Sequence, residues 1–393
     1  MTNFRPKDER ELAAIIAEAV EREEPLELLA GGSKRGLGRP LQLPHTLALS
    51  EFSGIGSYEP EELVLTAGAA TPLDEIEKVL AAKRQMLAFE PGDWRILLGS
   101  AGTHPSLGGA VAANLSGPRR IRQGAARDHF LGFRAVSGRG EPFKAGGRVV
   151  KNVTGYDLPK LMAGSFGTLA ALTEVTLKVL PMPEATRTLV ILGLDDERAR
   201  RAMSAALTSS HEVSGAAHLP ASVSPDGART LLRLEGPEPS VVARADALRR
   251  ELQEFGAIDM LDDAASHTAW RKVRDASPVA RAGAAVWRVS VAPTDGPALA
   301  ACIAQAHDTR HFFDWGGGLV WLAVTGAEDG GAAAIRGAIA GGHATLISAP
   351  DALRTVVPPF EPQAPALAAL TARVKTQFDP RRILNRGRMY RDL

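Results

Sequence analysis

Two stretches rich in small residues carry the clearest chemical signal in this chain of 393 residues. One is AGGSK at 30–34, which follows a short apolar run, and the other covers residues 100–117. Glycine lets a large ligand approach the backbone, and successive N–H groups of a turn can cradle an anion. We therefore expect the two stretches to hold one phosphate-containing cofactor between them. The alternative for each is an ordinary turn or close packing of small residues.

A run of basic residues follows the second stretch, with Arg119, Arg120, Arg122 and Arg127 inside nine residues. Guanidinium groups bind phosphates and carboxylates through paired hydrogen bonds. The position of the run favours an anion site, and a solvated surface is the alternative. Neither a GxxxxGK[ST] loop nor a GxGxxG between a strand and a helix occurs, which disfavours P-loop NTPases and Rossmann dehydrogenases.

Hydrophobic periodicity predicts the elements that position these stretches. We expect helices at 8–23, 71–82 and 107–114, and strands at 26–30, 47–52, 63–67, 86–89, 130–137, 141–144 and within 164–180. The 107–114 helix would begin in the small-residue loop and leave N–H donors for a phosphate. Pro181 and Pro183 end the last strand. We place a domain boundary there, so that the first domain covers residues 1–181.

The second half predicts the order β-α-β-β-α-β twice, as in two ferredoxin-like halves of one cap domain at 182–350. The first half has strands at 186–193, 215–219, 229–235 and 256–261, with helices at 196–208 and 239–254. After a helix at 265–275, the second half has strands at 284–292, 310–314, 318–324 and 343–348, with helices at 295–307 and 331–340. The final segment, 351–393, would return to the first domain through Pro-rich 357–365 and a helix at 366–377.

The composition is that of a globular protein, with 45% hydrophobic and 23% charged residues and a net charge of +1. Such a balance creates no field that would recruit nucleic acid. The single cysteine, Cys302, excludes a disulfide within the chain and an iron–sulfur cluster ligated by this chain alone. We expect a cytoplasmic location, no signal peptide and no membrane-spanning segment. Attachment to the inner face of the membrane through a partner stays open.

The motifs, taken in order and spacing, resemble the FAD-binding domain of the vanillyl-alcohol oxidase / p-cresol methylhydroxylase (PCMH) type. The matching pieces are AGGSK at 30–34, GTHPSLGGAVAANLSG at 102–117, RD at 127–128 and GSFGTLAALTEVTLKVLP at 164–181. The resemblance implies an α+β fold: a PCMH-type FAD-binding domain of two subdomains, an α+β cap, and a C-terminal return segment.

Two further pieces, together with the short total length, resemble the family of short FAD-binding subunits found in bacterial glycolate oxidases. They are SGPRR at 116–120 and VVKNVTGYDLPKLMAGSFGTL at 149–169. The C-terminal FDPRRILNRGRMY at 378–390 is also similar to the FDP-x-x-x-x-N-x-G ending of the wider flavoprotein group. The resemblance implies a role in glycolate oxidation within a complex that also contains a catalytic FAD subunit and an iron–sulfur subunit. Two alternatives stay open: a structural subunit that assists assembly, and a stand-alone flavin-dependent reductase.

The resemblance also implies which residues contact FAD. One side of the pyrophosphate would be covered by Gly31, Gly32, Ser33 and Lys34. The other side, extending toward the flavin, would be lined by Thr103, Ser106, Gly108, Gly109, Asn114 and Gly117. The adenylate end would lie near Gly167, Thr168 and Val175, and Asn385 would approach the ring from the tail.

The chain departs from relatives of this type in two respects. Many of them attach flavin through a histidine in the first loop, and residues 31–34 contain none. We therefore expect non-covalent FAD, although His104 lies in the second loop. An H-x-G-D-G-N-x-H motif for metal and substrate is also absent, and 311–321 is the nearest stretch. We predict no metal site, and the catalytic residues stay unassigned.

Overall fold

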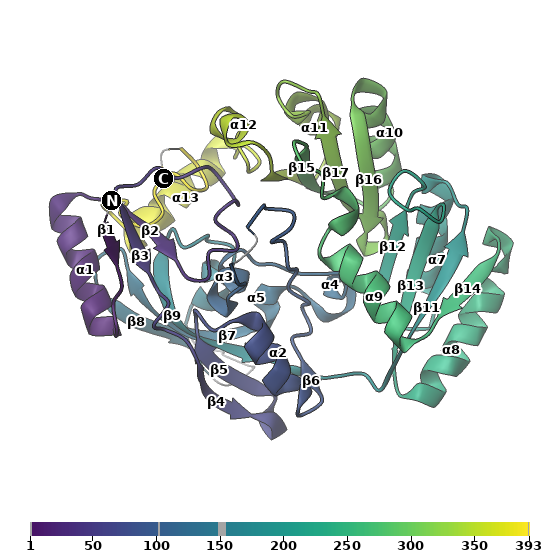
Figure 1. The fold of residues 1–393 in the computed structure, drawn as a ribbon, viewed down its shortest axis with the longest axis horizontal. Helices are drawn as coiled ribbons and strands as arrows, with labels where there is room; N and C mark the ends of the chain where they lie inside the picture. The colour runs from purple at the N-terminus through teal and green to yellow at the C-terminus, as the bar shows by residue number, and fades with distance from the viewer. Residues whose placement is uncertain (1, 101–102, 148–154, 392) are drawn as a thin grey trace.

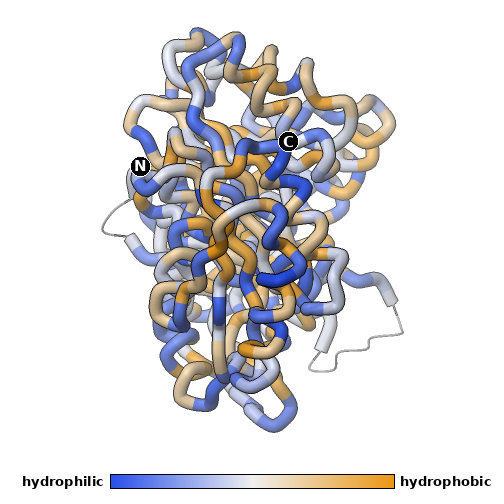
Figure 2. The backbone as a smooth tube through the Cα atoms, turned by 90° about the vertical axis from the view of Figure 1, so that its right-hand side faces the viewer, coloured by the Kyte–Doolittle hydropathy of each residue, from blue (hydrophilic) through white to orange (hydrophobic). Residues whose placement is uncertain are grey.

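The computed structural model describes residues 2–100, 103–147, 155–391 and 393. Figure 1 shows two parts: an N-terminal part formed by β1 to β10, which the C-terminal segment rejoins, and a cap part formed by β11 to β18. Hydrophobic and hydrophilic segments alternate along the backbone (Figure 2). The predicted α+β class is confirmed, whereas the domain limits at 181 and 350 stay predictions.

A small parallel sheet in the order β1-β3-β2 begins the N-terminal part. Its elements are β1 (Thr2–Phe4), α1 (Glu9–Arg22), β2 (Leu26–Leu29) and β3 (His45–Ala48). Asp8 starts the helix by accepting a hydrogen bond from the N–H of Glu11. The helix buries Leu12 and Ile16 against Leu47 of the central strand.

The C-terminal tail lies beside the edge strand of this sheet. The N–H of Leu26 donates to the carbonyl of Ile383 at 2.7 Å, and the N–H of Asn385 donates to the carbonyl of Leu26 at 3.0 Å. Leu384 thereby pairs with Leu26 in parallel. Residues 383–385 therefore lie directly beside β2, the strand that leads into the first glycine loop.

A five-stranded antiparallel sheet, in the order β4-β5-β9-β7-β8, forms the rest of the N-terminal part. Its strands are β4 (Ile55–Glu59), β5 (Val64–Gly68), β7 (Phe130–Ser137), β8 (Pro142–Gly146) and β9 (Ala170–Lys178). The helices are α2 (Leu73–Ala81), α3 (Leu107–Ala112), α4 (Arg120–Gln123), α5 (Ala126–His129) and α6 (Leu158–Met162). Ile76 of α2 and Val111 of α3 pack against Leu177 in the core of this sheet.

Some expected elements differ from those in the structure. The strand predicted at 86–89 is only Gln85–Met86 (β6), which pairs with Leu180–Pro181 (β10). The helix expected from residue 71 begins at Leu73, because the hydroxyl of Thr71 bonds the carbonyls of Gly54 and Gly68. The C-terminal segment contains an unexpected helix, α12 (Asp351–Val356), before α13 (Pro365–Phe378).

The cap part is one eight-stranded sheet, in the order β14-β11-β13-β12-β16-β17-β15-β18. Its first half consists of β11 (Ala185–Leu192), α7 (Asp196–Thr208), β12 (Gly215–Leu219), β13 (Arg229–Gly236), α8 (Glu238–Glu251) and β14 (Ile258–Leu261). After α9 (Asp263–Arg274), the second half has β15 (Ala285–Ser290), α10 (Gly296–Ala306), β16 (Asp308–Asp314), β17 (Leu319–Thr325), α11 (Ala332–Ala338) and β18 (His343–Ser348). The two halves meet edge to edge at His218 and Phe313, which pair across β12 and β16.

The two faces of the cap sheet have different partners. Helices α7, α8, α10 and α11 cover one face with an apolar core that includes Trp287. The other face packs against the N-terminal part, where Trp321 of β17 meets Trp94 edge-on at 5.4 Å between ring centroids. Among the described residues, none of the helices combines the length and apolar character that crossing a membrane requires.

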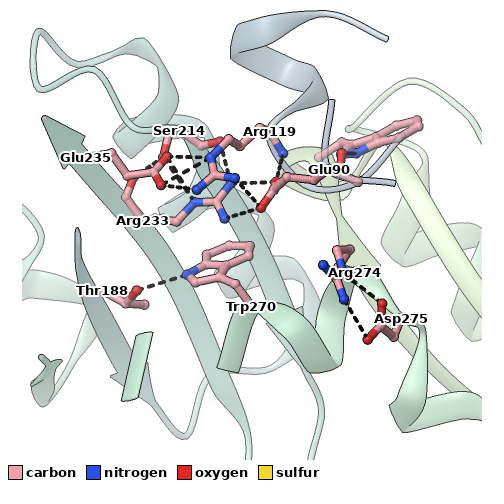
Figure 3. A network of polar contacts seen from close by, with 11 residues as sticks. Glu90, Arg119, Thr188, Ser214, Arg233, Glu235, Trp270, Arg274 and Asp275 are labelled. Carbon is pink, nitrogen blue, oxygen red and sulfur yellow. Dashed lines mark hydrogen bonds and ion pairs between the residues drawn. The ribbon is translucent and has the colours of Figure 1, made fainter. Parts of the chain in front are cut away.

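A buried ion cluster, shown in Figure 3, joins the two parts. Both guanidinium nitrogens of Arg233, on β13, lie 3.0 Å from the carboxylate of Glu90. Arg119 bonds Glu90 at 2.7 Å and Glu235 at 2.5 Å. Burial acts to raise the pKa of Glu90, but the charges of Arg233 and Arg119 hold it below its usual value. The two cations and two anions balance, as a buried ion cluster requires.

Candidate FAD-binding site

The two small-residue loops of the sequence lie side by side. The N–H of His104 donates to the carbonyl of Gly31 at 3.3 Å, and the hydroxyl of Ser100 donates to the carbonyl of Ser33 at 2.9 Å. A side chain at Gly31 would collide with the His104 carbonyl, because its Cβ would lie 2.0 Å away. Residues 101 and 102 of the second loop lie outside the described residues.

A cavity opens between these loops and the C-terminal tail. Its walls are mostly apolar, with a few polar and charged groups, as is typical of small-molecule and cofactor sites. Nine of the residues assigned to FAD contact from sequence line it: Gly31, Gly32, Ser33, Lys34, Ser106, Gly108, Gly109, Gly167 and Asn385. Apolar side chains such as Leu28, Leu172 and Phe166 complete its walls. The structure thus brings together segments from four distant regions of the chain.

The other five assigned residues do not line this cavity. Thr103 lies beside the first loop, 3.5 Å from the position that a Cβ at Gly32 would take. Asn114 accepts a hydrogen bond from the N–H of Arg127 at 3.1 Å. A Cβ at Gly117 would lie 2.5 Å from the Glu90 carbonyl, and Val175 is wholly buried in the core of the large sheet. Their roles at FAD stay predictions.

Thr168, the fifth of these, lies behind the cavity wall. Its hydroxyl donates to the carbonyl of Ser165 at 2.7 Å, and its own carbonyl accepts from Lys375 at 2.6 Å. Lys375 is 2% exposed and also bonds Asp379 at 2.7 Å and the carbonyl of Leu384 at 3.1 Å. This buried pair fastens the tail to the turn before β9 that contains Gly167 and Thr168. Sequence analysis missed it, although Lys375 and Asp379 stand four residues apart next to the tail motif.

The expectation that α3 offers N–H donors to a phosphate is wrong for its first residues. The N–H of Leu107 donates to the carbonyl of Thr71 at 3.0 Å, and that of Gly108 to the carbonyl of Ala69 at 2.7 Å. The hydroxyl of Ser106 accepts from the N–H of Gly109 at 3.4 Å. Because the N–H groups of Leu107 and Gly108 already bond backbone carbonyls, they are not free to bind a phosphate. Anion binding in the cavity therefore depends more on its cationic side chains than on the first N–H groups of α3.

Lys34 is the first cation of the cavity. It is half-buried, and its nitrogen lies 3.3 Å from the hydroxyl of Ser33. Burial lowers the pKa of Lys34 to about 8, against the opposing charge of Asp93. The nearby Arg35 is already neutralised by Glu27, to which it donates at 2.8 and 2.5 Å. The ammonium of Lys34 is therefore desolvated and suited to an anionic ligand.

Arg388 is the second cation. It belongs to the basic tail that the sequence suggested as either a solvated segment or a docking surface for FAD phosphate or a partner, and it is not among the residues assigned to FAD contact. It is 6% exposed, and its guanidinium donates to the carbonyl of Lys34 at 2.7 Å. Burial lowers the pKa of Arg388 to about 10, more than the charge of Glu27 restores. The small-residue walls and these two cations fit the diphosphate of FAD.

Asn385 positions the tail at the cavity. Its side-chain oxygen accepts from the N–H of Leu28 at 2.8 Å, and its side-chain nitrogen donates to the carbonyl of Phe166 at 2.8 Å. Asn385 has a φ of 44°, a conformation that asparagine tolerates better than most residues. The amide thus connects β2, the loop before Gly167 and the tail.

The basic run of the sequence does not form one site. Arg119 belongs to the buried cluster with Glu90, Arg122 pairs with Glu212 at 2.6 Å, and Arg127 lies 4.0 Å from Asp128. Each of these three arginines has a different acidic partner. The sequence-based prediction that they share one anion site is therefore wrong.

Among the described residues, the cavity lining contains neither a carboxylate nor an imidazole that could remove a proton from a hydroxyl. The described part of the chain also holds no cluster of three His, Cys, Asp or Glu side chains suited to a metal ion. His311, in the stretch nearest to the missing metal motif, bonds Asp196 at 2.8 Å instead. The arrangement fits cofactor binding and identifies no catalytic base.

Comparisons with known proteins agree with this interpretation of the cavity. Residues 3–146 match the family model described as FAD binding domain. Glycolate oxidase subunit GlcE of Escherichia coli K12 is 35% identical over 386 residues, covering 96% of both chains. Glycolate oxidase subunit GlcD of Bacillus subtilis is 27% identical, over 48% of this chain and 38% of its own length.

The structural comparison shows the fold. The crystal structure of p-cresol methylhydroxylase with substrate bound has a TM-score of 0.74 and 13% identity, covering 99% of this chain and 88% of that one. Together with the GlcE match along nearly the whole sequence, this confirms the PCMH-type fold and FAD as the cofactor. The chain belongs to the family of the glycolate oxidase subunit GlcE, FAD-binding proteins of the oxidoreductase class.

Proposed function

We propose that this chain is the FAD-binding subunit of a glycolate oxidase complex and takes part in the oxidation of glycolate to glyoxylate. The observation that carries the proposal is the 35% identity to a glycolate oxidase subunit over 96% of both chains. FAD, when bound, supplies a two-electron acceptor. In this chain, Lys34 and Arg388 compensate the charge of its diphosphate, and the loops that meet at Gly31 shield it from water.

Electrons leave the proposed complex through another subunit. The chain has one cysteine, Cys302, which is exposed on α10, and iron–sulfur clusters need several thiolates. We therefore assign the iron–sulfur cluster to a partner subunit. Glycolate is oxidised at the FAD of a larger partner subunit, at the FAD of this chain, or at the two in sequence. A cytoplasmic complex at the inner face of the membrane is part of this proposal.

FAD binds without a covalent bond in this proposal. Among the described residues that line the cavity, none is a histidine or a cysteine. His104 is exposed and pairs with the first loop through its backbone. Acid precipitation of the purified chain should therefore release all of its flavin into the supernatant. Flavin that stays with the pellet would contradict this part of the proposal.

A second candidate function is structural. The lack of a carboxylate or imidazole in the described cavity lining favours a subunit whose FAD fold supports assembly while a partner oxidises the substrate. Both candidates place FAD in the same cavity. They differ in whether loss of that FAD stops glycolate oxidation in an intact complex.

The variant Gly109→Trp tests the proposal in the complex purified from its host. A Cβ at Gly109 would lie 3.0 Å from the Ser106 hydroxyl and 3.8 Å from Lys34, so an indole would fill the cavity. We expect loss of flavin from this subunit and at least a tenfold fall in glycolate-dependent dye reduction. Gly337→Trp is the control, because Gly337 is exposed with open space around it. Unchanged oxidation in a complex that has lost this flavin would favour the structural role.

A further inference from the structure

A second set of charged groups lies between the two parts, and it is not balanced as the Glu90 cluster is. Arg120 comes from α4 of the N-terminal part, and Arg288 comes from β15 of the cap. Their guanidinium carbons lie 4.5 and 4.9 Å from the ring centroid of Trp315. The indole nitrogen of Trp315 donates to the carbonyl of Gly117 at 3.1 Å. The tryptophan thus holds two cations at the boundary between the parts.

Arg288 faces the N-terminal part. Side chains alternate along a strand, and Val286, two residues earlier, belongs to the apolar core that the cap shares with Trp94. The intervening Trp287 packs into the core under the helices on the opposite face. The side chain of Arg288 therefore lies on the same face as Val286, toward Arg120.

Within the described residues, neither guanidinium forms a hydrogen bond or an ion pair, and the acids nearby act on them only through their charges: Asp128 on Arg120 and Asp314 on Arg288. Burial, with a contribution from the charge of Arg120, lowers the pKa of Arg288 to about 10. Burial and the charge of Arg288 also lower the pKa of His343, on β18. Desolvated cations without an anion are costly.

The nearest buried acid does not supply the missing charge. Asp314 is 2% exposed, and burial raises its pKa to about 7. One of its oxygens accepts from the N–H of Trp315 at 2.7 Å, so its polar contact is to the backbone. At neutral pH this carboxyl is only partly ionised, and the excess positive charge of the two arginines persists.

We propose that Arg120, Arg288 and Trp315 form a binding site for a small carboxylate anion at the boundary between the N-terminal and cap parts. The planar fork of a guanidinium matches the two oxygens of a carboxylate. The identity of the ligand as glycolate or its oxidation product glyoxylate rests on the proposed function. Inorganic phosphate shares the anion chemistry, so the experiment has to separate it from carboxylates.

The experiment is calorimetric titration of the full FAD-loaded chain, without oxygen, using glycolate, glycolamide and inorganic phosphate as probes. We expect glycolate to bind in the millimolar range or tighter, and glycolamide, its neutral counterpart, to bind at least tenfold more weakly. Arg288→Met and Arg120→Met should each weaken glycolate binding by about tenfold or more, because each removes a charged hydrogen-bond donor. Arg310→Met is the matched control, since Arg310 is exposed on β16 of the same sheet.

Any of four results would overturn the inference. Three concern the wild type: no glycolate binding, equal binding of glycolamide and glycolate, or tighter binding of phosphate than of glycolate. The fourth is glycolate binding that is unchanged in both arginine variants. Flavin content and melting temperature show whether each variant is folded, and Arg288→Lys, which keeps the charge, should retain part of the affinity. Glycolate-dependent turnover of the assembled complex is measured separately, so a failure of the proposed function is distinguishable from a failure of this site.

Discussion

Replacing Lys34 by methionine tests whether cationic side chains, rather than backbone amides, hold the diphosphate of FAD. Methionine is unbranched and only one atom shorter than lysine, and it removes the charge. Burial lowers the pKa of Lys34 from 10.5 to about 8, which corresponds to about 3 kcal/mol of unfavourable desolvation. A phosphate oxygen beside the ammonium would relieve much of this cost. Hydrogen bonds to charged groups contribute about 1.5–3 kcal/mol. We therefore expect Lys34→Met to weaken FAD binding by roughly 10- to 100-fold.

The pH dependence supplies an independent readout of the same contact. In the apo-protein Lys34 loses its proton near pH 8, and bound diphosphate would raise that pKa. Below pH 8 the side chain is charged in both states, so FAD affinity stays level. Above pH 8 binding requires proton uptake, and affinity falls by up to about tenfold per pH unit. The methionine variant should lack this fall.

The assay is titration of apo-protein with FAD, followed by quenching of flavin fluorescence between pH 6.5 and 9.5. Lys83→Met is the control, because Lys83 is exposed beyond α2. The reasoning is refuted if Lys34→Met binds FAD as tightly as the wild type, or if wild-type affinity stays level through pH 8 to 9.5. Either result would assign the diphosphate to other groups.

Three further predictions concern stability, each measured by chemical or thermal unfolding. Lys375→Met leaves Asp379 buried without its cation, so we expect the free energy of unfolding to fall by about 3–5 kcal/mol and FAD to be released earlier in unfolding. Lys78→Met, in the exposed pair with Asp74, is the control and should cost under about 1 kcal/mol. Glu90→Gln removes one anion from the buried cluster and should also lower the free energy of unfolding by about 3–5 kcal/mol. Glu212→Gln, in an exposed pair with Arg122, should change it little, and equal effects of the two variants would contradict the argument from burial. Asp314 has a pKa raised from 3.8 to about 7, so its contribution to stability is present at pH 4 and is lost as pH rises toward 7. Asp314→Asn should therefore be as stable as wild type at pH 4 and more stable than wild type at pH 8, by up to about 4 kcal/mol. The same stability difference at both pH values would count against this.

Much of the candidate site could be predicted from local sequence. The loops at Gly31 and Gly108 carry their information in residue type, because only glycine allows the approach to His104 and Ala69 that the structure shows. The cap was predictable for a similar reason, since its alternating strands and helices repeat one order. The joining of its halves at His218 and Phe313 was not, because a single pairing between strand edges leaves no periodic pattern.

Long-range ion pairing is where sequence reasoning reached its limit. Arg119 and Arg120 are adjacent in the chain and look equivalent, yet one is neutralised by Glu90 and Glu235 and the other stacks on Trp315. Glu235 lies 116 residues from Arg119, so no local pattern connects them. Only the folded chain therefore distinguishes the balanced ions, which fasten the two parts together, from the arginines at Trp315, where we propose that an anion binds.

That distinction applies equally at the cofactor cavity. Arg35 and Lys34 are neighbours, but Glu27 neutralises the arginine and leaves the lysine without a carboxylate close enough to pair with it among the described residues. Arg388 reaches the same place from the end of the chain, held there by the contacts of Asn385 and by the buried Lys375. Because the tail supplies both a wall and a charge, the cavity is complete only after the chain has closed on itself. Cofactor binding and docking of the tail should therefore be coupled, each stabilising the other by the same free energy.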